Sequence, residues 1–143
     1  MQLRATGRSI AFSGVDQATP IDAGPATASG NLPANPAVAV TTVTDKAWVV
    51  DSLAVRLAAT TVAGPGQTVP VVPSDWRFTV GAGNTGVRGA GSYKTAQSPA
   101  GSVVTMTWTV TGAPPVPLTK GWVYSALALR PAPRVYVLNW NEM

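Results

Sequence analysis

The chain has 143 residues, of which 45% are hydrophobic and only 11% are charged. A chain of this length forms one domain, and its 14 glycines and 13 prolines exclude a helical bundle, a coiled coil or a doubly wound α/β fold. It contains no cysteine and no histidine, so disulfides, zinc–thiolate sites, thiol nucleophiles and a Ser-His-Asp triad are excluded within this chain.

The net charge is +4, and the ten basic residues are scattered with no two adjacent. Nucleic-acid-binding proteins usually cluster their basic residues on one element, so we expect no nucleic-acid partner. Residues 1–8 carry charge but no apolar stretch follows them, so we expect no signal peptide. The longest uncharged run, 95–119, is rich in Thr, Gly and Pro, so we expect no membrane-spanning helix.

Short β-rich runs bounded by Gly, Pro, Asn and Asp predict strands along the whole chain. In chain order these strands cover 8–15, 37–44, 47–57, 75–80, 87–96, 102–111, 121–130 and 134–140. The segments between them are predicted to be a long linker over 16–36, loops over 58–74 and 113–118, and turns over 81–86 and 98–101.

The clearest alternation of side chains lies between residues 103 and 110. One face carries Val104, Met106, Trp108 and Val110, and the other carries Val103, Thr105, Thr107 and Thr109. This pattern indicates an antiparallel strand with one buried face and one solvated face. The run 122–129 is apolar on both faces and is predicted to lie centrally or under a covering loop or partner. The number and spacing of strands predict an all-β, antiparallel two-sheet β-sandwich.

Several short motifs follow one another in a characteristic order. They are SIAFSGVD at 9–16, TPID at 19–22, AWVV at 47–50, DW at 75–76, SPAG at 98–101 and WVYSALALRPA at 122–132. This order resembles jelly-roll β-sandwich domains found in phage virion proteins and in exported bacterial proteins, which often end W-x5-ALRP. The resemblance implies a jelly-roll-like fold. It implies no catalytic motif, cofactor or site residue.

In that family several strands precede the SGVD motif, whereas here only seven residues precede Arg8. We therefore expect a β-sandwich domain over 1–132 that lacks its first strands, and a C-terminal strand or arm over 133–143. Because exposed strand edges are usually covered, the fold is expected to be completed by contacts between subunits. The residues expected to form this interface are Arg134, Tyr136, Leu138 and Trp140.

The tryptophans could be either sugar-stacking platforms or core and interface residues, since an indole buries a large area. They are Trp48, Trp76, Trp108, Trp122 and Trp140. Trp108 and Trp122 lie in strong strand patterns and are predicted to be in the core, as is Trp76 in a more open position. Trp140 lies in the tail and is predicted to make an intersubunit contact.

The acidic residues offer few candidates for chemistry. Asp16 and Asp22 could bind calcium, but we expect them to accept local backbone hydrogen bonds in turns. Asp51 could form a glycosidase pair with Asp75 or Asp45, but we expect it to face outward or to pair with an arginine. No catalytic, metal-binding or cofactor-binding residue is therefore predicted. The run 81–86 matches G-x-G-x-x-G, but without a following helix it is predicted to be a hairpin turn.

These observations favour a non-enzymatic phage virion structural protein, such as a capsid decoration or minor head protein that reinforces the head lattice. The alternatives are a phage tail component and a carbohydrate- or surface-binding β-sandwich module. The expected partners are further copies of the chain, the major capsid protein or other virion proteins, with glycan binding less favoured. The expected location is the virion, which is assembled in the host cytoplasm.

Overall fold

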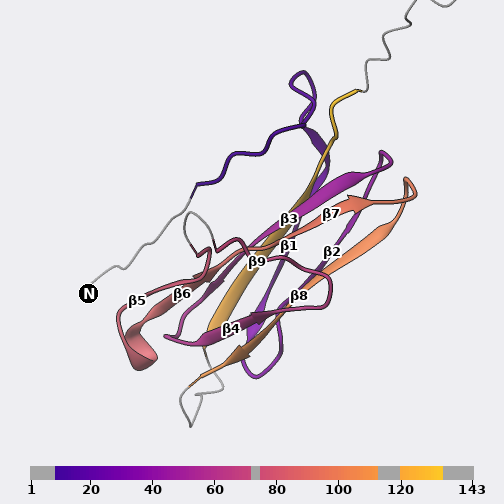
Figure 1. The fold of residues 1–143 in the computed structure, drawn as a ribbon. Coiled ribbons are helices and arrows are strands. Elements are labelled where there is room, and N and C mark those ends of the chain that lie inside the picture. Colours follow the sequence, from indigo (N-terminus) through magenta and orange to yellow (C-terminus); the bar gives the residue numbers. More distant parts are fainter. Residues whose placement is uncertain (1–8, 72–74, 113–119, 134–143) are drawn as a thin grey trace, which may run out of the picture.

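The computed structural model describes residues 9–71, 75–112 and 120–133 (Figure 1). These residues form two antiparallel sheets and one short 3-10 turn, so the predicted all-β sandwich is confirmed. The strands are β1 (Ile21–Asn31), β2 (Ala37–Thr41), β3 (Ala47–Val55), β4 (Thr60–Ala63), β5 (Phe78–Val80), β6 (Val87–Ala90), β7 (Tyr93–Gln97), β8 (Val103–Thr111) and β9 (Gly121–Leu129), and the 3-10 turn is η1 (Gly83–Thr85).

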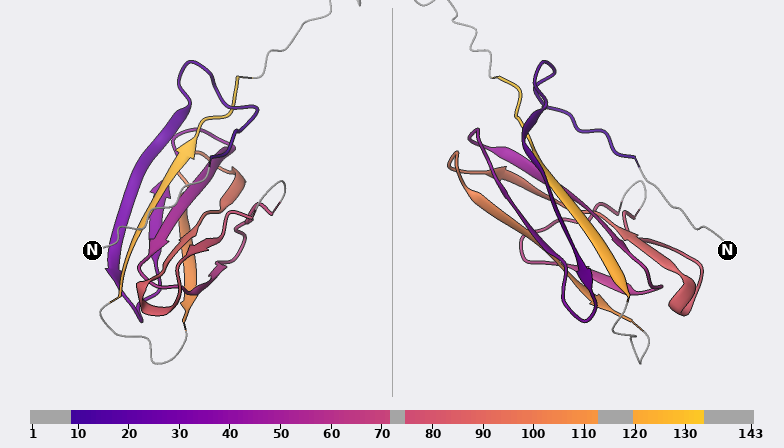
Figure 2. Two further views of the ribbon diagram at one scale, coloured as in Figure 1. Left: turned by 90° about the vertical axis from the view of Figure 1, so that its left-hand side faces the viewer. Right: turned by 180° about the vertical axis from the view of Figure 1, so that it is seen from behind.

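The larger sheet has the strand order β1-β9-β3-β6-β5, with β7 also paired to β3. The smaller sheet has the order β2-β8-β4 and lies against the larger one (Figure 2). Strand β9 is central, as predicted, because it pairs with β1 on one side and with β3 on the other. The two faces of the larger sheet therefore differ. One packs against the smaller sheet, and the other is its outer face.

The core between the sheets is built from alternate residues of each strand. In β8, Val104, Met106 and Trp108 are buried, and Trp108 is only 1% exposed, which confirms the predicted alternation. Trp122 is also buried, as predicted, and its Nε1 donates a hydrogen bond to the carbonyl oxygen of Ala34 at 3.0 Å. Burial of these two indoles removes large apolar areas from water and contributes strongly to folding.

The prediction of a linker over 16–36 is wrong, because β1 pairs with β9 along most of its length. Small side chains are what allow this strand to fit. A Cβ atom at Gly30 would lie 2.7 Å from the Trp122 ring, so the indole needs a glycine opposite it. The predicted strand over 8–15 is also wrong, since among the described residues 9–15 only Val15 forms a β-bridge, to Pro131. The strand beside β9 is thus supplied by the segment that the composition marked as a linker.

The loop predicted over 58–74 contains the short strand β4, which pairs with the end of β8. The alternation of buried and exposed side chains in β4 is not visible in the sequence, because two adjacent residues are both threonine. Thr61 is buried toward the core, whereas Thr60 and Val62 are exposed. Threonine favours strands through its branched Cβ, and this preference decides the local structure here.

Candidate functional site

A buried carboxylate lies at the centre of the sandwich. Asp51 of β3 is only 7% exposed and faces the smaller sheet, so the prediction that it faces outward or pairs with an arginine is wrong. It accepts hydrogen bonds from Tyr124 Oη at 2.6 Å, Trp108 Nε1 at 3.1 Å, Gln67 Nε2 at 3.2 Å, Ser92 Oγ at 2.8 Å and the Ser92 amide at 2.6 Å. Because Trp108 is in β8 and Tyr124 is in β9, this network joins the two sheets.

Burial raises the pKa of Asp51 above its ordinary value, and the hydrogen bonds that it accepts oppose this rise. Burial and the neighbouring carboxylate also raise the pKa of Tyr124 far above its ordinary value. The Tyr124 hydroxyl therefore stays protonated and donates a hydrogen bond to Asp51. Every partner of Asp51 acts as a donor, so the arrangement satisfies a buried carboxylate and serves structure.

Two further carboxylates hold backbone segments in place. Asp16 accepts hydrogen bonds from the amides of Ala18 at 2.9 Å and Thr19 at 3.2 Å, which confirms the predicted turn and lowers the pKa of Asp16. Asp22 instead accepts bonds from the distant amides of Val43 at 2.7 Å and Thr44 at 3.0 Å, so the expectation of local bonding is wrong for it.

Asp22 also lies 3.7 Å from Nε of Arg130. Burial alone would raise the pKa of Asp22, but the hydrogen bonds from Val43 and Thr44 and the charge of Arg130 together lower it. Asp75 pairs with Arg77, whose Nε and Nη2 donate at 3.0 and 2.9 Å. Within the described residues, neither Asp75 nor Asp45 is among the hydrogen-bond partners of Asp51.

The glycine-rich run 81–86 is confirmed as a turn. It contains η1 and joins β5 to β6, which pair with each other. Within the described ranges, no three acidic side chains gather in a way that could hold a metal ion. The described segments also include no helix long and apolar enough to cross a membrane.

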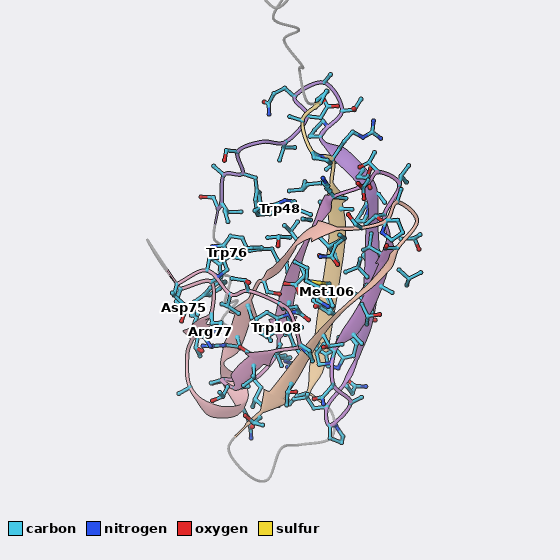
Figure 3. The ribbon with its side chains drawn as sticks, turned by 45° about the vertical axis from the view of Figure 1, so that its right-hand side comes forward. Trp48, Asp75, Trp76, Arg77, Met106 and Trp108 are labelled. Atoms are coloured by element: carbon cyan, nitrogen blue, oxygen red, sulfur yellow. The ribbon has the colours of Figure 1, made fainter. Side chains whose placement is uncertain are left out.

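An aromatic cluster lies outside the main core. Trp48 of β3 stacks on Tyr93 of β7, with ring centroids 5.4 Å apart and an interplanar angle of 18°. Phe12 meets Trp48 and Trp76 edge-on, with centroids 6.2 and 6.4 Å apart. All four rings are half-buried, so Trp76 is not the core residue that the sequence predicted. Figure 3 shows Trp48 and Trp76 near each other at one side of the sandwich. The sequence also gave no sign that Phe12 joins this cluster.

A shallow groove of about 570 Å³ runs over β1, β9 and β3 on the outer face of the larger sheet. Its outward side chains are small and uncharged: Thr27, Ser29, Ser52, Ala54, Val123 and Ser125. The strand register places Thr27, Ser125 and Ser52 in one row. Val123 is 59% exposed. The face is hollow here because these side chains are too short to fill it, and it presents hydroxyl and methyl groups at the surface.

The residues expected to form the interface, Arg134, Tyr136, Leu138 and Trp140, lie outside the described residues. Comparisons with protein-family models, with curated proteins and with solved structures found no match to this chain. The likeness to virion jelly-roll domains therefore rests on the sequence motifs, and the site must be interpreted from its own geometry.

Proposed function

We propose that this protein is a non-enzymatic structural component of a phage virion that binds the outside of the head and reinforces contacts between capsid subunits. The observation that carries the proposal is the uncharged outer face of the larger sheet. From Trp48 to Ala54 in β3 and from Val123 to Leu129 in β9, the outward positions carry no charged side chain. Such a face can lie against another protein without desolvating a charge.

The use of the carboxylates supports a role without catalysis. Asp51 is saturated with donors between the sheets, Asp22 holds the turn after β2, and Asp75 is paired with Arg77. A catalytic acid or base needs access to a substrate proton, and a carboxylate committed to structural bonds does not offer it. A stiff sandwich with a neutral face is better suited to recognition.

The proposed work is thermodynamic. A protein that binds only the assembled lattice stabilises it by mass action, as any ligand stabilises the state that it prefers. Many copies can pack closely because the surface carries little charge, and a net charge of +4 is largely screened at physiological salt. The partners would be neighbouring copies and the major capsid protein, in a jelly-roll arrangement completed by the segment 134–143 from a neighbouring subunit. The location would be the virion.

One observation favours a second function, a carbohydrate- or surface-binding module. The stacked rings of Trp48 and Tyr93 and the hydroxyl row of the groove lie on the same face of the larger sheet. Aromatic faces and hydroxyl groups are the chemistry that binds sugars. Retention of the purified protein on a glycan, lost in Trp48→Ala, would favour this function over a virion role.

The proposal is tested on particles. Particles released from cells that carry this gene are purified on a density gradient and analysed by mass spectrometry and electron cryomicroscopy. We expect the chain in amounts comparable with the major shell protein and a small sandwich on the head surface. Density on the tail alone would support the tail component instead, and absence from the particles would overturn the proposal.

A further inference from the structure

Residues 9–14 form an N-terminal arm that runs outside the sandwich and bends at Ser13 and Gly14 (Figures 1 and 2). Phe12 is half-buried, and the other residues of the arm are exposed, Ile10 to 45%. Within the described part of the chain, the first backbone hydrogen bonds to the body come at the carbonyl of Gly14 and the amide of Asp16. The arm is therefore held on the sandwich chiefly by one aromatic ring.

The sandwich itself builds the receptor for that ring. Phe12 lies against Trp48 and Trp76 with interplanar angles of 76° and 86°, the edge-to-face geometry that aromatic pairs favour. Trp48 is fixed by its stack on Tyr93, and Trp76 lies over Gly91, where an added Cβ would come within 3.1 Å of the indole. Figure 3 shows both tryptophans on the same side of the body. The receptor thus depends on residues outside the arm.

The arm meets the body at a residue suited to a hinge. Gly14 has a φ of +74°, and no atom lies within 4 Å of the position where its Cβ would be. Glycine adopts this left-handed conformation without the steric cost that other residues meet, and it can leave it as easily. Changes of φ and ψ at Gly14 would swing residues 9–13 without disturbing the sandwich.

We propose that this arm is exchanged between copies of the chain, so that Phe12 of one copy docks between Trp48 and Trp76 of another. The exchanged contacts are identical to those within one copy, so exchange loses no interaction. It costs the entropy of association, which falls as the local concentration of copies rises. Because Phe12 lies only two residues from Gly14, the two bodies must lie side by side for the exchange. The site recognises a second copy of this chain, and the inference does not depend on a virion role.

Photo-cross-linking of the full chain tests the exchange. Phe12 is replaced by benzoylphenylalanine, which keeps an aromatic ring, and light and nitrogen-15-labelled copies are mixed over a range of concentrations before irradiation. We expect cross-linked peptides that join a light copy to a heavy copy near Trp48 and Trp76, and their share should rise with concentration. Cross-links confined to single copies at every concentration, or none at all, would overturn the proposal.

Matched variants separate exchange from other self-association. Phe12→Ala should abolish the arm-exchanged dimer in sedimentation, because the arm then carries no ring that can dock on another copy. Ile10→Ala, in the same arm but exposed, should leave it unchanged, and Phe12→Tyr should restore it. Circular dichroism checks that each variant keeps its sandwich. A dimer that survives Phe12→Ala unchanged would show that copies associate through another surface.

Discussion

The network around Asp51 predicts a large and specific loss of stability in Asp51→Ala. Truncation leaves the Tyr124 hydroxyl, the Trp108 indole N–H and the Ser92 amide without their buried acceptor. Each unsatisfied buried group costs about 1–3 kcal/mol, and part of that cost is recovered when neighbours shift. We therefore expect the free energy of unfolding to fall by about 4 kcal/mol, a large part of the 5–15 kcal/mol typical of a domain.

The assay is urea unfolding followed by circular dichroism, with Asp45→Ala as the matched control. Asp45 is exposed in the turn before β3, and its truncation should change the free energy of unfolding by less than about 0.5 kcal/mol. Asp51→Asn should lie between the two, because it keeps one acceptor oxygen but turns its NH2 group toward a group that can only donate, the Ser92 amide or the Trp108 indole. A loss below about 1 kcal/mol in Asp51→Ala would refute the reasoning.

Three further changes test other parts of the structure. Because the pKa of Asp22 is lowered, the stability that its carboxylate contributes is present above about pH 4 and is lost as the pH falls. Asp22→Asn should therefore lower the free energy of unfolding in urea by about 1–2 kcal/mol at pH 7 and by much less at pH 3. Gly30→Ala should lower the free energy of unfolding by about 1–3 kcal/mol because its Cβ meets Trp122, while the neighbouring change Ser29→Ala should be nearly neutral in the same assay. Truncation after Ala132 should leave a folded sandwich by circular dichroism that no longer attaches to particles; full occupancy of heads would exclude the tail as the anchor.

Much of the fold could be predicted because its signals are local. The alternation in β8 and the apolar run of β9 each occupy one short stretch of sequence and report directly on burial. Strand β1 could not be predicted in this way. Its glycines, alanines and Pro25 disfavour a strand by propensity, and only the contact with Trp122 on the neighbouring strand explains why a glycine is needed at position 30.

The network around Asp51 could not be predicted either, because it depends on distant residues. Its donors lie between 16 and 73 positions along the chain from Asp51. The parity of Asp51 with Val49 and Leu53 in β3 did indicate an inward side chain. Burying a carboxylate is generally costly, which favours an outward side chain. Asp51 can be buried here because several donors converge on it.

The Gln67 side chain does more than donate a hydrogen bond to Asp51, because its oxygen also binds the edge of β8. Its Oε1 accepts the Thr107 amide at 2.7 Å, the Gly64 amide donates to the Thr107 carbonyl, and Lys94 Nζ donates to the carbonyl of Thr105. In the described residues β4 pairs only with the last part of β8, so side chains and a loop occupy the hydrogen-bonding groups that β4 leaves open. An unpaired edge would invite another chain to add a strand. Because Gln67, Gly64 and Lys94 occupy this edge of β8, copies of the chain can crowd together with little risk of incorrect strand pairing there.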